Sequence, residues 1–561
     1  MSDESVESVR PLERGLAVLR ALAPAEPGRL RAGDLVRATG LARSTVDRVV
    51  ATLAHLGYVR VRGQELHLTP RLMELGNAYL AASGLTGEVA ARTARLADEL
   101  DESVSLAVPD GDGVRFVTQA ARRRAMSVAF RIGDLLPPER CAPGALFAQE
   151  WDEARWAAWR TRTAAEDATE AAHATEATRD ASAAYPALPP GPAPHGLPDL
   201  AARVARSRET GWALDDQLIE PGLIAVAVPV RDGAGRIRYA LSAVSHTSRH
   251  TADGLADAML PRLRAEAARL ARLSAVQPSP PAEGPARAPA TDAVAAKADL
   301  GPGFLQSLAR GLAVLRALGE ARGDGLPLTA LAAATELPRA TARRCLHTLE
   351  RAGYAAHDGR LYRPLPRILE LGHAPLSGLT FAEIAEPHLR DLTDRVRQSA
   401  SVTVLDGTDI RYVARAAAAR VMSVHITVGT RFPAYATAMG RVLLAGLPGP
   451  ERARLLAAAP PRALTARTVT ETGALARLLD RAAADGHATA DQELEEGLRS
   501  VAVPVRDARG RVVAALNVAQ HAGSGPLAEA RDALLPVLRE TAAAIETDLH
   551  TAARFNTVRL S

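Results

Sequence analysis

Apolar residues recur at helical spacing near the start of the chain, and the same pattern returns in its middle. Residues 308–318 place four leucines on one face of a predicted helix, and residues 12–22 carry a closely similar pattern 296 positions earlier. Residues 226–232 return as residues 501–507, at an offset of 275. Because a solenoid repeat is only tens of residues long, the sequence predicts a duplicated multidomain unit fused into one chain.

The second copy then predicts two short helices separated by a tight turn. Residues 328–334 form the first helix, capped at or near Thr329, and residues 335–337 form the turn. Pro338 suits the first position of the next helix, which runs to about Arg351.

A predicted hairpin follows these helices. Residues 355–362 contain Asp358 and Gly359, a strong two-residue turn signal. The first copy has the same plan, with helices at 32–39 and 42–56 and a hairpin around Gly63. This succession is that of a winged helix-turn-helix, whose second helix enters the DNA major groove and whose hairpin touches the backbone.

The remainder of each copy alternates between strand-like and helix-like patterning. A connecting helix is predicted in each copy, at residues 70–80 and 364–373. In the second copy strands are predicted at 401–405, 411–414, 420–428, 499–505 and 512–519, with a helix at 434–447. Antiparallel strands with helices between them indicate an α+β sensor domain.

The expected fold class is α+β, built from two tandem units. Each unit is a winged helix-turn-helix domain followed by an effector-binding-like domain. In the first unit the winged domain is expected at 8–69 and the effector-binding-like domain at 70–273, with an Ala-rich insert at 160–198 outside the core. A Pro/Ala linker is expected at 274–303. In the second unit the winged domain is expected at 304–363 and the effector-binding domain at 364–555.

Composition narrows the chemistry. The 561 residues are 47% hydrophobic but only 3% aromatic, so the cores must consist of Ala, Leu and Val. The net charge of +4 is mildly basic and does not by itself establish nucleic-acid binding. Lys297 is the single lysine, so an anion site in the folded units would be a planar guanidinium site.

Targeting and redox features point to an intracellular protein. No apolar run is long enough to span a bilayer, and the first residues lack an export signal. Cys141 and Cys345 occupy non-equivalent positions in the two copies, which does not suggest a disulfide. A cytoplasmic location without a membrane partner is therefore expected.

The candidate DNA-binding side chains lie on the two predicted reading helices and on the hairpins, where the cations are expected to be exposed. Arginine suits guanine or phosphate, and hydroxyl groups suit phosphate or base edges. The same spacing in both copies favours DNA binding over a merely solvated polar face. The candidates are Arg43, Ser44, Thr45, Arg48, Arg60, Arg62, Arg339, Thr341, Arg343, Arg344 and Arg360.

The sequence contains none of the common catalytic motifs. A phosphate-binding Walker loop, a nucleotide-binding glycine loop after a strand, a zinc-protease motif and a nucleophile elbow are all missing. No catalytic residue, cofactor or metal site is expected. Cys141 and Cys345 are interpreted as small buried residues, with a thiol sensor as the alternative for each.

Several stretches resemble the IclR family of bacterial transcriptional regulators. The matching residues are 307–315, 329–332, 349–354, 364–372, 421–441 and 491–504. The second copy is most similar to the branch that regulates protocatechuate, β-ketoadipate and 4-hydroxybenzoate catabolism. The resemblance implies a GAF-like effector domain, dimers that can pair into tetramers, and a small carboxylic or aromatic acid as effector.

The resemblance also implies the pocket residues of the second copy. They are Ser423, Gly429, Arg431, Thr437, Ala438, Gly440, Arg441, Asp491, Glu493, Arg499, Ser500 and Asn517. An equally weighted alternative is that the arginines form structural ion pairs with the nearby acids. The first copy departs from the pattern: Cys141, Pro143 and Ala145 replace the Thr, Met and Arg, which puts acid recognition there in doubt.

These inferences predict a DNA-binding regulator that senses a small aromatic or dicarboxylic acid through its second unit. The expected partners are a double-stranded DNA operator, the acid, and further copies of the chain through the effector domains. Two alternatives remain open: a regulator without effector sensing, and a small-molecule-binding or hydrolytic enzyme whose helix-turn-helix serves only dimerisation. The equivalent first helices, residues 12–22 and 308–318, are expected to pair within one chain.

Overall fold

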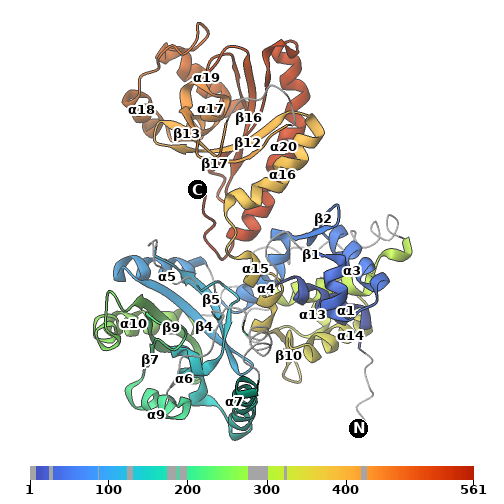
Figure 1. Cartoon of the computed structure of the whole chain (residues 1–561), viewed down its shortest axis with the longest axis vertical. Helices are drawn as coiled ribbons and strands as arrows, with labels where there is room; N and C mark the ends of the chain where they lie inside the picture. Colours follow the sequence, from blue (N-terminus) through green and yellow to red (C-terminus); the bar gives the residue numbers. More distant parts are fainter. Residues whose placement is uncertain are drawn as a thin grey trace. The chain divides into compact units, whose positions relative to one another are not determined.

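The computed structural model describes residues 8–23, 30–85, 87–122, 130–172, 185, 188, 199–275, 301–320, 325–418 and 426–560. The chain divides into two compact units, whose boundary differs from that between the two tandem copies (Figure 1). From here on, "first unit" and "second unit" mean these compact units. The first comprises Met1–Ser377 with Arg554–Asn556, and the second comprises Gly378–Ala553 with Thr557–Ser561. Within the described ranges, no helix is both long enough and apolar enough to cross a membrane.

The first winged helix-turn-helix forms where the sequence predicts it. Gly40 ends the second helix in the left-handed region at φ 64°, which glycine adopts without steric cost. The elements are α1 (Arg10–Leu22), β1 (Leu30–Arg31), α2 (Ala32–Thr39), α3 (Arg43–His55), β2 (Val59–Arg62) and β3 (Glu65–Leu68), with strand order β1-β3-β2.

The second winged helix-turn-helix repeats this plan with three differences from the prediction. Pro338 is the N-cap of the second helix and not its first residue. Thr329 does not cap its helix, because Pro327 occupies the N-cap position. The wing turn has four residues instead of two. The Asp358 carboxylate stabilises this turn by accepting hydrogen bonds from the N–H groups of Arg360 and Leu361. These hydrogen bonds also lower the pKa of Asp358. The elements are α12 (Gln306–Ala317), α13 (Leu328–Ala334), α14 (Arg339–Arg351), β10 (Ala355–His357) and β11 (Tyr362–Pro364).

The two first helices, α1 and α12, pack against each other inside the first unit. A Cβ atom on Gly15 would lie 2.3 Å from Leu308 Cδ1, and a Cβ atom on Gly311 would lie 2.4 Å from Leu12 Cδ2. Both leucines are fully buried. The expected pairing of the first helices within one chain is therefore confirmed.

Hydrogen bonds at the helix N-termini follow the same reciprocal arrangement. The Val9 N–H donates to Thr348 Oγ1 at 2.9 Å, and the Leu305 N–H donates to Thr52 Oγ1 at 3.0 Å. Thr52 lies on α3 and Thr348 on α14, at positions 296 residues apart. Each predicted reading helix is thus held by the first helix of the other copy.

The connecting segments lie close to this paired core. In the first copy the segment is the 3-10 turn η1 (Pro70–Leu72) and α4 (Met73–Ala82); in the second it is broken into η6 (Pro366–Leu371) and α15 (His373–Leu376). Gly319, in the 3-10 turn η5 (Leu318–Glu320), packs against Ala78 of α4. His373 is fully buried against Gly76, and burial lowers its pKa to about 3, so the ring is neutral.

Each effector-type domain contains a six-stranded antiparallel sheet. In the first, the order β6-β5-β4-β9-β8-β7 joins β4 (Ser103–Asp110), β5 (Gly113–Ala120), β6 (Leu135–Leu136), β7 (Ala213–Asp216), β8 (Leu223–Arg231) and β9 (Ile237–His246). Its helices are α5 (Gly87–Leu100), α6 (Ala142–Phe147), α7 (Glu153–Ala172), α9 (Leu200–Thr210) and α10 (Ala252–Ala275), with the 3-10 turns η2 (Pro138–Arg140) and η3 (Ala148–Glu150).

The second effector domain repeats the order as β14-β13-β12-β17-β16-β15. Its strands are β12 (Ser399–Asp406), β13 (Asp409–Ala416), β14 (Arg431–Pro433), β15 (Ala488–Asp491), β16 (Leu498–Arg506) and β17 (Val512–His521). Its helices are α16 (Phe381–Val396), α17 (Ala438–Ala445), α18 (Gly449–Ala458), α19 (Thr472–Asp485) and α20 (Leu527–Ala553), with the 3-10 turns η7 (Ala434–Ala436) and η8 (Ala522–Ser524).

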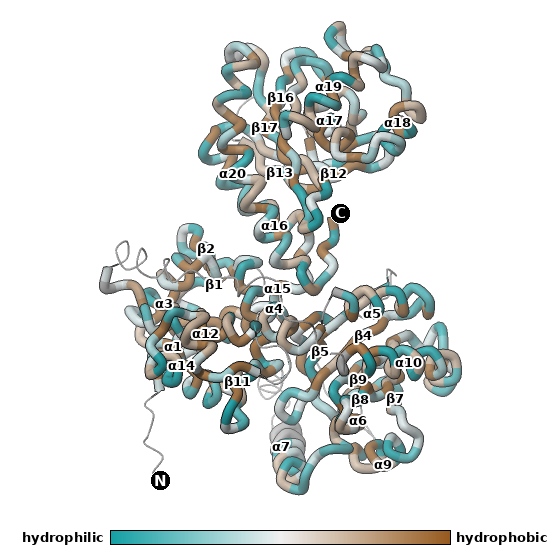
Figure 2. The backbone as a smooth tube through the Cα atoms, turned by 180° about the vertical axis from the view of Figure 1, so that it is seen from behind, coloured by the Kyte–Doolittle hydropathy of each residue, from teal (hydrophilic) through white to brown (hydrophobic). Residues whose placement is uncertain are grey.

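The two faces of this second sheet carry separate cores. Helices α16 and α20 cover one face, where Phe381, Leu389 and Leu538 are buried (Figure 1). Helices α17 and α19 cover the other face, where Met439 and Leu479 are buried. Figure 2 shows the corresponding pattern in both sheets, with hydrophobic residues along the strands. This α+β arrangement confirms the predicted fold class.

Two predictions about the effector domains need correction. Residues 426–428 are not a strand; the described edge strand is β14, and residues 419–425 lie outside the described ranges. The Ala-rich insert is not wholly outside the fold, because α7 continues to Ala172, Tyr185 is buried beneath the Arg162 guanidinium, and Leu188 packs on the core. The linker prediction falls largely on residues 276–300, which lie outside the described ranges.

The contact between Gly319 and α4 leads to a stability prediction. A Cβ atom at position 319 would lie 2.5 Å from Ala78 Cα, so Gly319→Ala forces backbone apart and should destabilise the first unit by about 1–3 kcal/mol. The matched control is Gly33→Ala, where a Cβ atom meets nothing within 4 Å. Thermal unfolding of the full chain should show a lower melting temperature for Gly319→Ala alone; equal melting temperatures would contradict the packing.

Candidate functional site

The second helix of each winged domain presents a polar face outward. On α3, Arg43, Ser44 and Arg48 are exposed and Thr45 is half-buried. Asp47 is also exposed, and its carboxylate pairs with the Arg43 guanidinium at 3.0 Å.

The outward face of α14 is more cationic. Arg339, Arg343 and Arg344 are exposed, and Thr341 is half-buried. The opposite face is apolar and buried, and consists of Ala342, Cys345, Leu346 and Leu349. The arrangement leaves the arginines available to a ligand outside the protein while the helix stays anchored.

The wings differ from their predicted exposure. Arg60 and Arg62 are half-buried, and the side chain between them, Val61, is 46% exposed. Arg360 is exposed, as expected. In the first wing the outward position therefore belongs to Val61, because successive residues of a strand point to opposite faces.

The buried cysteines have no features of reactive thiols. Burial raises the pKa of Cys345 to about 11 and that of Cys141 to about 12, so both thiols are protonated near neutral pH. This favours the interpretation of both as small buried residues over the thiol-sensor alternative.

The exposed arginines of α14 generate a prediction about DNA affinity. Replacing Arg343 and Arg344 by Ala should weaken operator binding by about 1–3 kcal/mol for each lost base contact. Folding should be unchanged, since neither side chain lies in the core. Gel shifts at fixed salt measure the effect, with exposed Arg454→Ala on α18 as the control. Unaltered affinity in a folded double variant would remove α14 as the reading helix.

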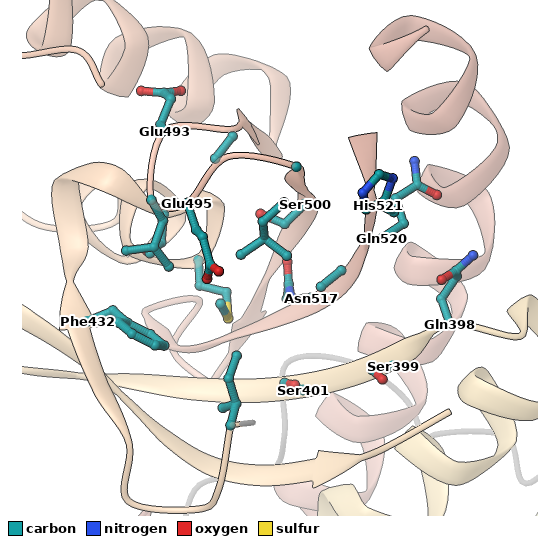
Figure 3. A pocket seen from close by; sticks show the side chains of 18 of the residues that line it. Gln398, Ser399, Ser401, Phe432, Glu493, Glu495, Ser500, Asn517, Gln520 and His521 are labelled. Atoms are coloured by element: carbon teal, nitrogen blue, oxygen red, sulfur yellow. The ribbon is translucent and has the colours of Figure 1, made fainter. Parts of the chain in front are cut away.

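The second unit contains a cavity of about 730 Å³ beside the central strands of its sheet (Figure 3). Its walls are Gln398, Ser399, Ser401, Tyr412, Arg415, Ala418, Ile426, Phe432, Ala436, Thr437, Met439, Ala490, Glu493, Leu494, Glu495, Glu496, Gly497, Leu498, Ser500, Asn517, Ala519, Gln520 and His521. The volume lies in the range usual for small-molecule sites, about 300–1,000 Å³.

Four of the pocket residues expected from the sequence line this cavity: Thr437, Glu493, Ser500 and Asn517. Seven do not: Gly429, Arg431, Ala438, Gly440, Arg441, Asp491 and Arg499. Ser423 lies outside the described residues. The cavity thus lies in the region of the expected residues, most of which do not line it, and their role in effector binding stays a prediction.

The three expected arginines are engaged with acids instead. Arg441 donates to Glu493 Oε1 at 2.7 Å, in a pair that is almost completely buried. Arg499 donates to Asp491 at 2.9 Å. Arg431 pairs with Asp409 at 3.2 Å. The structural ion-pair alternative is thus the one that the contacts support.

Gly440 and Thr437 have local structural roles. A Cβ atom on Gly440 would lie 2.0 Å from the Ala434 carbonyl oxygen, so only glycine fits there. The Thr437 hydroxyl accepts a hydrogen bond from the Gly440 N–H and caps α17. Gly144 of the first copy meets Pro138 in the same way.

Four polar residues of the cavity wall on β13 and β17 were not predicted from the sequence: Tyr412 and Arg415 on β13, and Gln520 and His521 on β17. Arg415 and Tyr412 both line the cavity although they are three residues apart on one strand. A register shift between Val402 and Thr403 leaves Val413 as an extra residue, and this bulge turns both side chains to the same face. The signal was not visible in the sequence, because strand alternation predicts opposite faces.

Two buried polar atoms among the described residues of the cavity wall lack a hydrogen-bond partner. They are Asn517 Oδ1 and Gln520 Nε2, and the Asn517 side chain is only 1% exposed. A buried polar group without a partner costs about 1–3 kcal/mol. A ligand that supplies a donor to Asn517 and an acceptor to Gln520 would recover this free energy.

The first copy keeps polar groups at the equivalent positions but changes their chemistry. Gln119 and Ser245 replace Arg415 and Gln520, and Ser242 replaces Asn517. All three side chains have buried polar atoms without a partner. Losing the arginine removes the guanidinium that the second copy places at its cavity.

Asp215 of the first copy is a buried carboxyl group at the position of Ala490. Its Oδ1 accepts a hydrogen bond from the Leu218 N–H at 2.9 Å, whereas its Oδ2 has no partner. Burial raises the pKa of Asp215 to about 7, against the opposing effects of that hydrogen bond and of Arg203.

This raised pKa predicts a pH-dependent stability. Folded Asp215 binds its proton more tightly than Asp215 of the unfolded chain, whose pKa is 3.8. The stability that this proton contributes to the folded state is therefore fully present below about pH 4 and is lost as pH rises through about 7. Asp215→Asn should therefore raise the melting temperature at pH 8 more than at pH 5. The exposed neighbour provides the control, Asp216→Asn. A pH-independent effect of Asp215→Asn would contradict the raised pKa.

Two winged helix-turn-helix domains joined to two sensor-type domains, one with an effector-sized cavity, define a ligand-responsive DNA-binding regulator. Comparison with known families identifies it further. The IclR helix-turn-helix domain matches residues 11–63 and 307–359, and the bacterial transcriptional regulator IclR C-terminal domain matches residues 195–272 and 373–547. The chain belongs to the IclR family and is a transcriptional regulator that carries the family's domains twice.

Individual relatives each correspond to about one copy. The Pca regulon regulatory protein of Pseudomonas putida is 45% identical over 238 residues, which are 42% of this chain and 81% of that protein. The p-hydroxybenzoate hydroxylase transcriptional activator of Acinetobacter baylyi is 32% identical over 43% of this chain and 90% of its own length. The crystal structure of a transcriptional regulator from Rhodococcus sp. RHA1 shares 49% identity over 45% of this chain and 100% of that chain, with a TM-score of 0.42.

Proposed function

We propose that the second unit binds a small aromatic or dicarboxylic acid in its cavity, and that this acid controls the regulator's affinity for its DNA operator. The observation that carries the proposal is a ligand-sized cavity that places a guanidinium and a buried, unpartnered amide oxygen beside aromatic rings. The domain bounds proposed from the sequence and a cytoplasmic location accord with this role.

The apolar part of the wall favours an aromatic ring. Tyr412 and Phe432 meet edge to face, with their ring centroids 6.1 Å apart, and Ile426 and Met439 complete this side. Burial raises the pKa of the Tyr412 hydroxyl, so it remains a neutral group. A flat ring packed against these side chains would bury apolar surface without displacing any charged group.

The charged part of the wall favours a carboxylate. Arg415 is the one arginine among the described residues of the wall, and its planar guanidinium can bind a carboxylate through two parallel hydrogen bonds. Glu493 is already engaged by Arg441. Figure 3 shows the Glu493 carboxylate turned away from Ser500 and Asn517, whereas Glu495 extends toward them. Glu495 therefore opposes the negative charge of an acid.

The relatives support the same class of effector. One is named for the Pca regulon and another for the activation of p-hydroxybenzoate hydroxylase. Their being regulators also supports a non-enzymatic role for this chain over the hydrolytic alternative. Association of chains through the sensor domains remains part of the proposal.

Binding of 4-hydroxybenzoate to the full chain tests the assignment. Arg415→Gln and Asn517→Ala should each raise the dissociation constant about tenfold or more, which corresponds to about 1.4 kcal/mol. Glu495→Gln should lower it, because a repulsive charge is removed. Arg431→Gln is the matched control, since Arg431 lies outside the cavity wall and pairs with Asp409. Isothermal titration calorimetry and thermal shift measure these effects.

Two results would contradict the proposal. One is tighter binding of benzamidine, the cation of similar shape, than of 4-hydroxybenzoate. The other is equal affinity of the acid for the parent chain and for Arg415→Gln.

A further inference from the structure

We propose that a single chain reads one operator with both of its winged domains, and that the two half-sites of this operator are unlike. A symmetric dimer of identical reading helices recognises a palindrome. Here the two reading helices belong to the same polypeptide and differ in sequence, so the recognised DNA has a direction. The inference rests on DNA binding by the winged domains and not on the identity of the effector.

The pairing surface of each winged domain is already occupied within the chain. Leu12 and Leu308 are fully buried. Leu12 packs against Gly311 of the second copy, and Leu308 packs against Gly15 of the first. The Arg316 guanidinium of the second copy also donates to Glu74 of the first at 2.9 Å. The α1 and α12 surfaces are consequently not available for pairing with a second chain.

The pairing of α1 with α12 also holds both reading helices, α3 and α14. Thr52 of α3 accepts from the N-terminus of α12, and Thr348 of α14 accepts from the N-terminus of α1. These contacts are equivalent under the 296-residue offset, so the two helices are related as in a symmetric dimer. Two such helices address half-sites about one helical turn of DNA apart.

The two reading helices carry different charges. Helix α3 contains two arginines and one aspartate, a formal charge of +1, whereas α14 contains four arginines and one glutamate, a formal charge of +3. The decisive position is Asp47, which corresponds to Arg343.

These side chains select different bases. Arginine binds the O6 and N7 atoms of guanine, whereas a carboxylate accepts a hydrogen bond from the N4 amino group of cytosine. Asp47 also holds the Arg43 guanidinium on the helix surface, while Arg343 cannot do so for Arg339 because both are cations. We therefore assign the guanine-rich half-site to α14 and a half-site with weaker contact and less guanine preference to α3.

The experiment selects operators for the full chain from random duplexes and maps guanine contacts by methylation interference. The expected operator is not palindromic, with guanine contacts concentrated in one half. Arg344→Ala should weaken contacts in that half, and Arg48→Ala should weaken them in the other half. Each should reduce affinity about 5- to 150-fold, the range for a contact of about 1–3 kcal/mol.

Exchanging the side chains of Asp47 and Arg343 between the two reading helices gives the most direct test. The double variant Asp47→Arg with Arg343→Asp should prefer the operator in which the bases read at the two exchanged positions are interchanged between the half-sites. Asp47→Arg alone should select a more symmetric operator. Arg454→Ala, exposed on α18, should change neither preference.

A palindromic operator at which Arg344→Ala disturbs both halves and Arg48→Ala disturbs neither would overturn the proposal, because two chains would then present α14 twice. That result would leave DNA binding and acid sensing intact, so it is distinguishable from failure of the proposed function. Loss of all DNA binding by the parent chain would instead contradict both.

Discussion

The reciprocal packing of two leucines against two glycines fixes how the two winged domains are arranged. Leu308 occupies the space that a side chain on Gly15 would need, and Leu12 does the same at Gly311. Each fully buried leucine contributes about 1.5–3 kcal/mol. Because α1 and α12 also hold α14 and α3 through their N-termini, this one contact fixes which two helices are presented together.

The helices of the winged domains could be predicted closely because local chemistry marks their ends. Gly40, Gly57 and Gly353 adopt positive φ angles at or just after helix C-termini, and such signals are legible in a single sequence. The exposure of Arg60 and Arg62 could not be predicted in the same way. A short two-sided strand has two possible faces, and a difference of one position exchanges its inward and outward side chains.

The side chains that line the cavity could be predicted only in part from the sequence. Sequence resemblance pointed to segments that border the cavity, but it could not decide whether Arg441, Arg499 or Arg431 faces a ligand or an acid. That choice depends on partners up to 52 residues away in the chain, as for Arg441 and Glu493. It also depends on the bulge at Val413, which brings Arg415 onto the face of Tyr412 and has no signature in the alternation of residues.

The differences between the two sensor domains follow the energetics of buried charge. Arg441 and Glu493 are replaced together in the first copy, by Ala145 and Leu218. Removing one partner of a buried pair costs about 3–5 kcal/mol, whereas replacing both with apolar residues is often neutral. The first copy therefore lacks this ion pair and still forms the same sheet, and Gly144 meets Pro138 as Gly440 meets Ala434. The duplicated fold therefore does not depend on this ion pair, and the two sensor domains can differ in the charges that they bury.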